Sequence, residues 1–197
     1  MAARVVRLHR TIASRRVTLA DEVLVAACGA GDQAALGTLY DRHSAAVLRF
    51  VKHLVKPSLN DVDDMVHDTF IAAYKASGRF RGGSAVRTWL LGIASNVVRH
   101  AVRARCRRQS LARAVECVVP PAVTTPDETL SASELRDAMA DAIDALPHNL
   151  RTVFVLCDIE DLACDDVAAA LRVPKGTLFR RRHEARRALR EALGSSR

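Results

Sequence analysis

Apolar residues recur every three or four positions along most of the chain, with polar residues between them. This period is that of an α-helix with one buried face. Gly31-Asp32 interrupts the pattern with a break and a helix N-cap, and Pro57-Ser58 ends the long segment that follows. The first half is therefore predicted to contain helices over about residues 20–30, 32–55, 60–77 and 84–107.

The second half follows a break at "ECVVPPAVTTPDETL", residues 116–130. Its three prolines and three threonines oppose a continuous helix and predict a linker. The helical period then returns, and Pro147 divides its first part because proline is unfavourable inside a helix. Helices are predicted over about residues 131–145, 148–159, 165–171 and 176–193.

These segments predict an all-α protein of two small helical domains joined by a flexible linker, the C-terminal one a helix-turn-helix. Hydrophobic residues make up 49% of the chain and aromatic residues 4%, a balance that favours helices around a buried core. The predicted division is a basic N-terminal arm over 1–19, a first domain over 20–110, a linker over 111–130 and a second domain over 131–197.

Charge lies in blocks along a chain whose formal net charge is +8. "NDVDDMVHD", residues 60–68, is strongly acidic, whereas "RHAVRARCRR", residues 99–108, contains no acid. Six arginines lie between positions 180 and 190. The positive excess predicts a polyanionic partner, and the alternating blocks indicate several partner surfaces.

The cysteines give no sign of a disulfide framework or a metal site. There are five, an odd number, and no C-x-x-C pair occurs. His148, Cys157 and Cys164 could approach one another, but their spacing matches no common zinc motif. We interpret the thiols as buried structural groups and expect no metal or cofactor.

Membrane and export signals are also missing from the sequence pattern. No apolar run reaches the length of a membrane span. The basic N-terminus, "MAARVVRLHRTIASRR", lacks the apolar core of a secretory signal and is predicted to be a disordered arm or a short extra helix. We therefore expect a cytoplasmic protein without direct membrane insertion.

The C-terminal segment reads as a helix-turn-helix: "DDVAAAL", then "RVPK", then "GTLFRRRHEARRALREAL". Ala168 suits a tight helix crossing, Val173 and Leu178 are spaced to fill the core between the helices, and Thr177 is predicted to cap the second helix. On that helix an apolar stripe faces the core. The opposite face carries Phe179, Arg180, His183 and Arg187. Arginine reads guanine edges or anchors phosphates, so we interpret this helix as a DNA reader rather than a solvated basic helix.

A second basic helix is predicted in "RTWLLGIASNVVRHAVRARCRR". It follows the glycine-rich turn "SGRFRGGS" and has a broad apolar arc. Its remaining face carries Asn96, Arg99, His100 and Arg103. An amide flanked by cations can bond bases and hold phosphates, although a surface asparagine is more often only solvated. We interpret Trp89 as a core residue rather than as a stacking platform for bases. For Phe80, both interpretations stay open.

These motifs, in this order, resemble the extracytoplasmic function (ECF) class of bacterial sigma factors. "DVDDMVHDTFIAAYKA" followed by "RTWLLGIASN" resembles the family's domain that reads the minus-ten promoter element. "ALPHNLRTVFVLCDIEDL" followed by "DDVAAALRVPKGTL" resembles the domain that reads the minus-thirty-five element. The resemblance covers about Asp21 to Leu193 and implies a protein that binds core RNA polymerase, recognises both elements and helps to melt the minus-ten region.

The resemblance also assigns roles to residues of this chain. The positions implied for core-polymerase binding are Asp61, Asp63, Asp64, Asp68 and Phe70. Those implied for the minus-ten element, partly single-stranded, are Arg79, Phe80, Asn96, Arg99, His100 and Arg103. Those implied for the duplex minus-thirty-five element are Thr177, Phe179, Arg180, Arg181, His183 and Arg187. Without the resemblance, the aspartates would be interpreted as a solvated face.

Departures from the family pattern cluster in the second half. The family usually has glycine where this chain has Asp161 and Arg172, and serine where it has Ala163. A non-glycine residue in a left-handed conformation costs roughly 1 kcal/mol, and the lost serine cap about the same. Arg182 stands where an apolar residue is usual, and Phe179 where a basic one is usual. The promoter sequence therefore cannot be transferred from a relative.

Two other classes of function fit the sequence less well than a sigma factor. A stand-alone helix-turn-helix regulator would not need the "D-x-D-D…W-L…I-A-x-N" half of the chain. An enzyme holding magnesium on the aspartates would need a nucleophile or base that is not evident. We expect no catalytic activity, a monomer when free, and an anti-sigma factor as an additional partner.

Overall fold

The computed structural model describes residues 20–55, 62–113 and 132–194, and within these ranges it contains helices and turns but no strand. The expected all-α fold is confirmed. The predicted N-terminal arm, Asp61 and most of the predicted linker lie outside the described residues.

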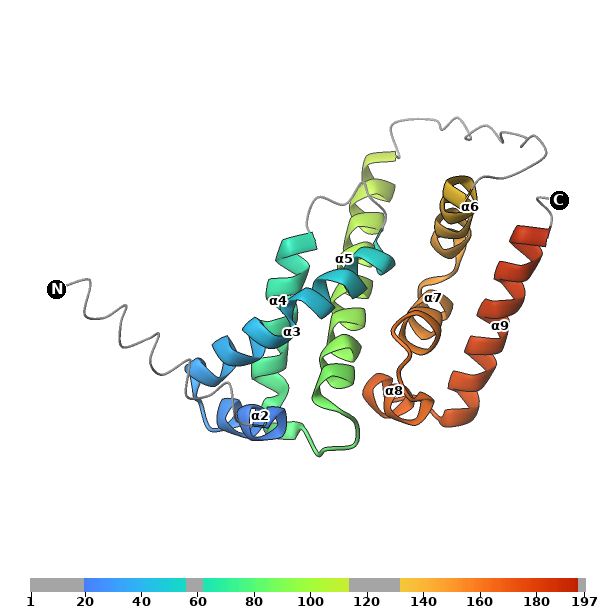
Figure 1. The fold of residues 1–197 in the computed structure, drawn as a ribbon. Helices are drawn as coiled ribbons and strands as arrows, with labels where there is room; N and C mark the ends of the chain where they lie inside the picture. Colours follow the sequence, from blue (N-terminus) through green and yellow to red (C-terminus); the bar gives the residue numbers. More distant parts are fainter. Residues whose placement is uncertain (1–19, 56–61, 114–131, 195–197) are drawn as a thin grey trace.

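The first half of the chain forms the group of helices on the left of Figure 1. Asp32 caps α3, as predicted, because its carboxylate accepts hydrogen bonds from the backbone N–H groups of Ala34 and Ala35 at 2.9 and 3.2 Å. α5 continues six residues beyond its predicted end at position 107. The elements of this half are α2 (Asp21–Gly29), α3 (Gln33–Leu54), α4 (Val62–Ala76), the 3₁₀ turn η1 (Ser77–Arg79) and α5 (Val86–Arg113).

The second half lies beside α5 on the right of Figure 1. Pro147 directly precedes α7, where the missing N–H of proline is tolerated. α8 and α9 are the predicted helix-turn-helix pair. The elements are α6 (Ala132–Ala145), α7 (His148–Phe154), the π-helical segment η2 (Val155–Ile159), α8 (Cys164–Leu171) and α9 (Lys175–Gly194).

The main hydrophobic core is continuous across both halves of the chain. Phe50 and Val98 from the first half and Leu156, Val167 and Leu178 from the second are all fully buried members of it. A smaller cluster, which includes Leu146 and Leu189, holds α6 against α9. The two halves therefore share apolar burial, the dominant favourable term in folding, instead of standing apart.

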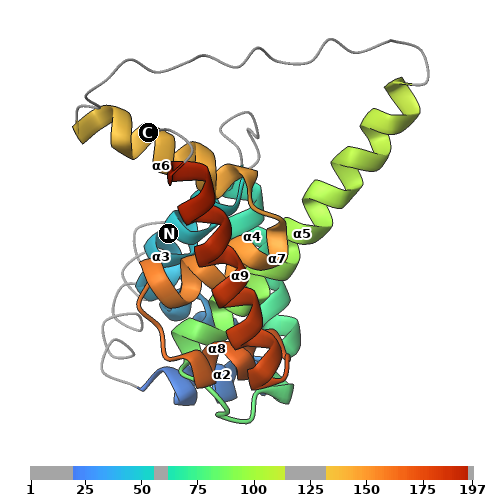
Figure 2. The same cartoon turned by 90° about the vertical axis from the view of Figure 1, so that its right-hand side faces the viewer.

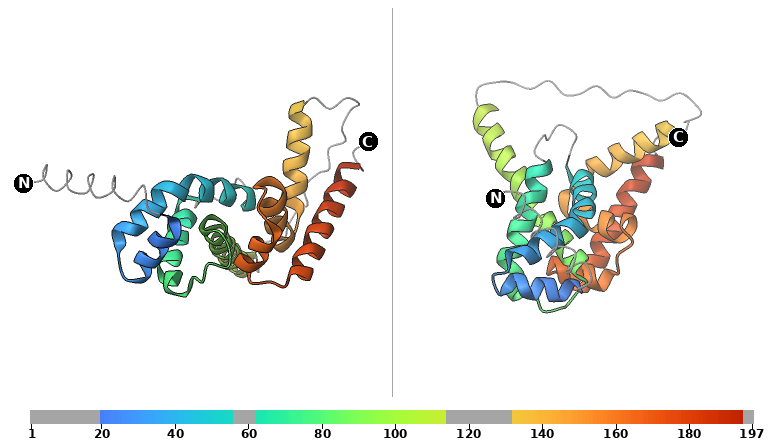
Figure 3. Two further views of the ribbon diagram at one scale, coloured as in Figure 1. Left: turned by 60° about the horizontal axis from the view of Figure 1, so that its bottom comes forward. Right: turned by 60° about the vertical axis from the view of Figure 1, so that its left-hand side comes forward.

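The packing between the halves is concentrated at one end of α5. Figure 2 shows α8 and the start of α9 beside the first turns of α5, whereas the C-terminal end of α5 points away from α6. The right-hand view of Figure 3 shows the same divergence of α5 and α6. The residues that position the candidate minus-ten surface thus lie next to the helix-turn-helix.

Candidate nucleic-acid and protein interfaces

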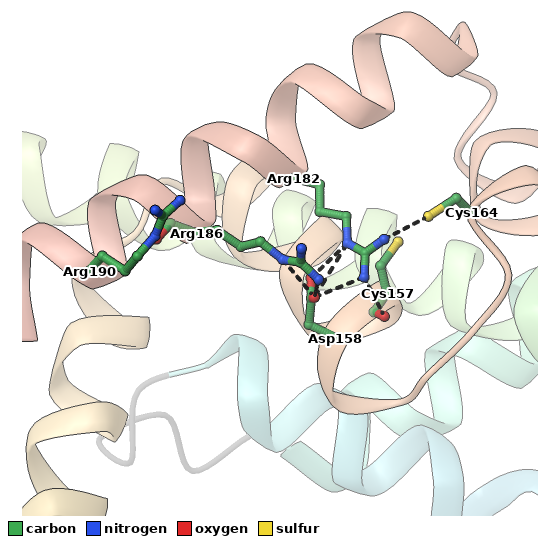
Figure 4. A network of polar contacts seen from close by, with 6 residues as sticks. All are labelled: Cys157, Asp158, Cys164, Arg182, Arg186 and Arg190. Atoms are coloured by element: carbon green, nitrogen blue, oxygen red, sulfur yellow. Dashed lines mark hydrogen bonds and ion pairs between the residues drawn. The ribbon is translucent and has the colours of Figure 1, made fainter.

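The arginines of α9 divide into two groups by what they contact. Arg182 and Arg186 turn back toward η2, where both donate hydrogen bonds to the carboxylate of Asp158 (Figure 4). Arg180 and Arg187 lie on the opposite, exposed face. The Arg180 Nε is 3.8 Å from a carboxylate oxygen of Glu184, and the Arg187 Nε is 3.5 Å from one of Glu191, in both cases one turn further along α9. Such exposed pairs contribute little, so these two guanidinium groups remain available to a ligand.

Asp158 binds α9 to η2. Its carboxylate accepts from the Arg182 Nη2 at 2.9 Å and from the Arg186 Nε at 2.9 Å. Burial raises the pKa of Asp158, but the hydrogen bonds from both arginines outweigh it and hold that pKa below its ordinary value. Asp158 is therefore a charged anchor for α9. The fold accommodates an arginine at position 182, where the family usually has an apolar residue, because the Asp158 carboxylate accepts its hydrogen bonds.

Two cysteines lie near this anchor. Arg182 also donates to the Cys164 Sγ at 3.3 Å and to the Cys157 carbonyl oxygen at 3.4 Å. Burial, together with the neighbouring Cys164, raises the pKa of Cys157 to about 12, so its thiol stays protonated at neutral pH. Within the described ranges no group of three His, Cys, Asp or Glu side chains is placed to hold a metal ion.

The exposed face of α9 carries most of the residues implied for the minus-thirty-five element. Phe179 is 52% exposed, and Arg180, His183 and Arg187 are exposed beside it. Leu178 on the other face is completely buried, as the apolar stripe predicted. The remaining two residues of that set, Thr177 and Arg181, are half-buried.

Two local expectations about the helix-turn-helix turn have different outcomes. The prediction that Thr177 caps α9 is wrong, because α9 begins at Lys175 and the Leu178 N–H already bonds to the Pro174 carbonyl oxygen at 3.1 Å. Thr177 instead lies inside the first turn. The expected left-handed conformation at Arg172 is confirmed by its φ of 54°. Asp161 before α8 has a φ of 50° and shares this conformation.

The residues implied for the minus-ten element lie along and beside α5. Asn96, Arg99, His100 and Arg103 are exposed. The Asn96 Nδ2 donates to the Gly92 carbonyl oxygen at 3.2 Å, and its Oδ1 accepts from the Arg99 Nη2 at 2.7 Å. These bonds hold the amide of Asn96, which lines a pocket, in one orientation.

The pocket beside Asn96 has a volume of about 310 Å³. The rings of Phe80 and Trp89 lie 5.0 Å apart in its wall, both half-buried, so the two aromatics form one surface. Arg79, exposed in the turn before Phe80, adds positive charge. The opposite wall comes from the second half of the chain, over residues 169–172.

α4 presents an acidic surface, but one implied residue does not reach it. Asp63, Asp64 and Asp68 are exposed on α4. Phe70 is only 2% exposed, with its ring centroid 4.8 Å from that of Tyr40. Phe70 therefore lies in the core beside Tyr40, a residue that is 40% exposed, and does not itself form part of the acidic surface.

Sequence reasoning missed the residues that join the two halves. Gly92 contacts Ala170 of α8, and Glu160 accepts from Arg87 of α5. An isolated glycine inside a helical pattern is a known sign of close packing, so Gly92 carried a signal. Nothing in the local sequence distinguishes Glu160 from a solvated glutamate.

His148 is another residue of this junction. Its Nε2 lies 3.4 Å from the hydroxyl groups of both Ser95 and Thr152. Burial lowers the pKa of His148 to about 4, and the charges of Arg99, Arg151 and Arg103 act in the same direction. The imidazole is therefore neutral at pH 7.

The fold is thus a helical protein with two basic helices, α5 and α9, and an acidic face on α4. Family models for "Sigma-70 region 2" and "Sigma-70, region 4" match residues 39–108 and 136–189. The chain is 35% identical over 179 residues to the ECF RNA polymerase sigma-E factor of Escherichia coli (strain K12), covering 87% of this chain and 93% of that protein. The corresponding factor of Haemophilus influenzae is 34% identical over 176 residues, covering 85% and 92%. The chain therefore belongs to the ECF class of RNA polymerase sigma factors.

Solved structures agree with this assignment. The structure of CnrH in complex with the cytosolic domain of CnrY has a TM-score of 0.61 at 29% identity and covers 90% of this chain and 99% of that one. The sigma factor RpoE of Bartonella quintana, solved with the anti-sigma factor NepR, has a TM-score of 0.58 at 23% identity, covering 78% and 93%. At that identity the second likeness concerns the fold alone. No helix in the described part of the chain is long and apolar enough to cross a membrane.

Proposed function

We propose that this sigma factor binds core RNA polymerase through the acidic face of α4 and directs initiation by reading two promoter elements with α5 and α9. The observation that carries the proposal is the coexistence of three exposed surfaces on one chain. Asp63, Asp64 and Asp68 form the first, Asn96 and its pocket the second, and the exposed arginine face of α9 the third. A stand-alone regulator needs only the third.

α9 is proposed to enter the major groove of the minus-thirty-five element. Its exposed side chains include Arg180 and Arg187 for guanine edges or phosphates and Phe179 for apolar contact with a thymine methyl group. Arg182 and Arg186 contribute differently, since their bonds to Asp158 fix the angle of the helix on its own domain. The orientation of the reader is thereby set before DNA binds.

α5 is proposed to hold the melted minus-ten strand. Extruding a base from the duplex costs a few kcal/mol, which contacts to the base and the backbone must offset. Asn96 offers hydrogen-bonding groups at the pocket mouth, and the Phe80–Trp89 surface offers an apolar wall. Arg99 and Arg103, one and two turns further along the exposed face of α5, supply positive charge for the strand's phosphates.

The remaining expectations follow from this role. Nucleotide addition belongs to the polymerase, so the sigma factor is proposed to have no catalytic activity of its own. We expect it to work in the cytoplasm, where it meets polymerase and DNA. An anti-sigma factor is proposed as a further partner, as NepR is for the sigma factor RpoE with which it was solved.

The first experiment is co-elution of the purified protein with bacterial core RNA polymerase on gel filtration. Asp64→Arg/Asp68→Arg reverses two exposed charges one turn apart on α4. We expect the wild type to co-elute and the double variant to lose at least about 90% of the complex, because four units of charge change against a basic partner.

The matched control is Asp137→Arg/Asp141→Arg, which makes the same charge change one turn apart on the exposed side of α6. This control variant should still co-elute with core RNA polymerase. Both variants should have the circular dichroism spectrum of the wild type. A wild type that ignores the polymerase yet binds duplex DNA alone would reject the proposal in favour of a stand-alone regulator.

A further inference from the structure

Two cysteine side chains meet beside the start of α9. Cys157 lies in η2, and Cys164 is the first residue of α8. Both are thiols, and a hydrogen bond joins their side chains. Figure 4 shows the two sulfur atoms beside the guanidinium of Arg182, pointing toward one another. A disulfide forms without large backbone movement only where two cysteines already lie close together, and this pair meets that condition.

The turn between η2 and α8 brings the two cysteines together. Asp161 in this turn has a φ of 50°, a left-handed conformation that ends a helix and redirects the chain. The Leu162 N–H then donates to the Leu156 carbonyl oxygen at 3.0 Å. The backbone on one side of the turn is thereby bonded to the backbone on the other side. Cys164 therefore returns to Cys157 although seven positions separate them in the chain.

The two sulfur atoms differ in their access to solvent. Cys157 is only 3% exposed, whereas Cys164 is half-buried. The Cys164 Sγ accepts a hydrogen bond from the Arg182 Nη1 at 3.3 Å, so a positive charge lies beside the more accessible sulfur. Reactive cysteines are partly exposed and lie in electropositive surroundings, whereas cysteines buried among apolar groups are inert. A dissolved oxidant should therefore react first at Cys164.

The charged groups around the pair leave an excess of positive charge. Asp158 accepts hydrogen bonds from Arg182 and Arg186, both at 2.9 Å, so one carboxylate meets two guanidinium groups. Asp165, at the start of α8, is paired with Lys175 at 2.7 Å. The remaining positive charge stabilises the hydroxide that leaves when a sulfur attacks a peroxide.

Cys157 has the properties of the second reactant. Burial, and after it the neighbouring Cys164, raises the pKa of Cys157 to about 12, so its thiol stays protonated while Cys164 is reduced. Oxidation turns the Cys164 sulfur into a neutral sulfenic acid, a group that condenses with a thiol to a disulfide. The negative charge that opposed ionisation of Cys157 is then gone.

We propose that Cys157 and Cys164 form a peroxide-reactive site that closes to a reversible disulfide. In the first step the Cys164 sulfur attacks a peroxide oxygen: the S–O bond forms, the O–O bond breaks, and hydroxide leaves and takes up the thiol's proton as water. The sulfur is oxidised and the peroxide is reduced. In the second step the Cys157 sulfur attacks the Cys164 sulfur: the S–S bond forms, the S–O bond breaks, and the hydroxyl group leaves as water with the Cys157 proton.

The disulfide ties η2 to α8 through a ring of eight residues, 157–164. This ring contains Asp158, the anchor of α9. A bond between groups that already touch stabilises a fold mainly by restricting the unfolded chain. Thiols reverse such bonds in a reducing compartment, where disulfides are transient and serve redox sensing. The site goes beyond the proposed function and does not rest on it, since its chemistry belongs to the free protein.

Mass spectrometry of a tryptic digest locates the bond. Residues 152–172 contain both cysteines and no lysine or arginine before Arg172, so trypsin releases them as one peptide. After the free, full-length protein is treated with hydrogen peroxide and then alkylated, this peptide should be unalkylated and lighter by two hydrogen atoms. Dithiothreitol should restore both thiols. Two alkylated thiols after peroxide, or a peptide joined to another cysteine of the chain, would overturn the proposal.

Arg182→Leu and Arg186→Leu are a matched pair of variants. Both arginines donate to the Asp158 carboxylate, and Arg182 also donates to the Cys164 sulfur. Arg182→Leu should form the disulfide at least about fivefold more slowly, whereas Arg186→Leu should stay within about twofold of the wild type. Equal slowing of both variants would reject the role of the Arg182 contact. Cys157→Ser should stop at the sulfenic acid of Cys164, which dimedone traps, and failure to trap it would refute the order of the two steps.

Thermal unfolding tests whether the pair is positioned for the bond in the native fold. The oxidised wild type should melt about 5 °C above the reduced protein, because a ring of this size restricts the unfolded chain. Cys28→Ala replaces a buried cysteine of α2 and should show the same rise on oxidation. Cys164→Ser should show none. A lower melting temperature of the oxidised wild type would mean that the bond distorts the fold, and the preformed pair would be rejected.

Discussion

Arg182 shows how a single contact decides what a charged side chain does. It lies in the arginine-rich stretch of α9, yet its guanidinium is held by Asp158 and by two groups of Cys157 and Cys164. The hydrogen bonds that Arg182 donates to Asp158 raise its pKa further, so the guanidinium is permanently charged. Its neighbour Arg180 is exposed and paired only weakly. One arginine is therefore part of the scaffold, and the other is part of the exposed face that is proposed to read DNA.

His148 makes stability depend on pH. Its pKa is about 4 in the folded protein and 6.5 as the ordinary value, so the unfolded chain takes up the proton first as the pH falls. The contribution of His148 to the free energy of unfolding therefore decreases as the pH falls from 6.5 to about 4, and it changes no further below pH 4. We expect His148→Gln to lessen the decrease in unfolding free energy between pH 7 and pH 4.5 by roughly 2 kcal/mol, after allowance for partial exposure.

The measurement is urea unfolding at a series of pH values. His53→Gln is the control, since His53 is exposed on α3 and the substitution should leave the wild-type slope unchanged. If His148→Gln had the same pH dependence as the wild type, His148 would not be the group responsible, and a neutral, half-buried imidazole at the junction would be refuted.

At the scale of elements, α8 is a short helix set between two left-handed residues. Asp161 precedes it with a φ of 50° and Arg172 follows it with a φ of 54°. Its N-cap Ala163 offers no side-chain hydrogen bond. With no side-chain cap at its N-terminus, this short helix depends on the tertiary burial of Val167 and Ala168.

Arg172→Gly should stabilise the helix-turn-helix. Glycine adopts the left-handed conformation without strain, a gain of about 1 kcal/mol that its greater freedom in the unfolded chain partly offsets. We expect a rise in melting temperature of roughly 1–3 °C by calorimetry. Arg172→Ala keeps the strained backbone while removing the side chain, so an equal rise in that variant would show that the backbone is not the cause.

For the whole molecule, the continuous core predicts cooperative unfolding of both halves. Trp89 is the chain's one tryptophan and lies in the first half, whereas circular dichroism reports all helices. In wild-type protein, fluorescence and circular dichroism should give coincident urea transitions, with midpoints within about 0.2 M, as two-state behaviour requires. Two separate transitions would show that the halves fold independently despite their shared core.

Gly92→Ala should separate the two transitions, because it removes the contact that couples the halves while leaving each helix intact. The fluorescence midpoint should stay near that of the wild type, since the first half keeps its own core of α2 to α5. The Gly37→Ala control should retain coincident curves.

The amino-acid sequence by itself determined the helices, most of their ends and the distribution of charge over them. Those properties depend on residues close together in the chain: the Asp32 cap, the Pro147 break, and the alternation of buried Leu178 with exposed Phe179. The acidic α4 and the two basic helices were visible for the same reason.

Only the tertiary structure decided which side chains of these helices are buried instead of exposed, and how the two halves pack together. Phe70 is buried under Tyr40, and Arg182 turns inward because Asp158, 24 positions away, lies beneath it. The contact of Gly92 with Ala170 joins two helices far apart in the chain. Local periodicity encodes which face of a helix is apolar, but the partner of that face is set by packing across the whole molecule.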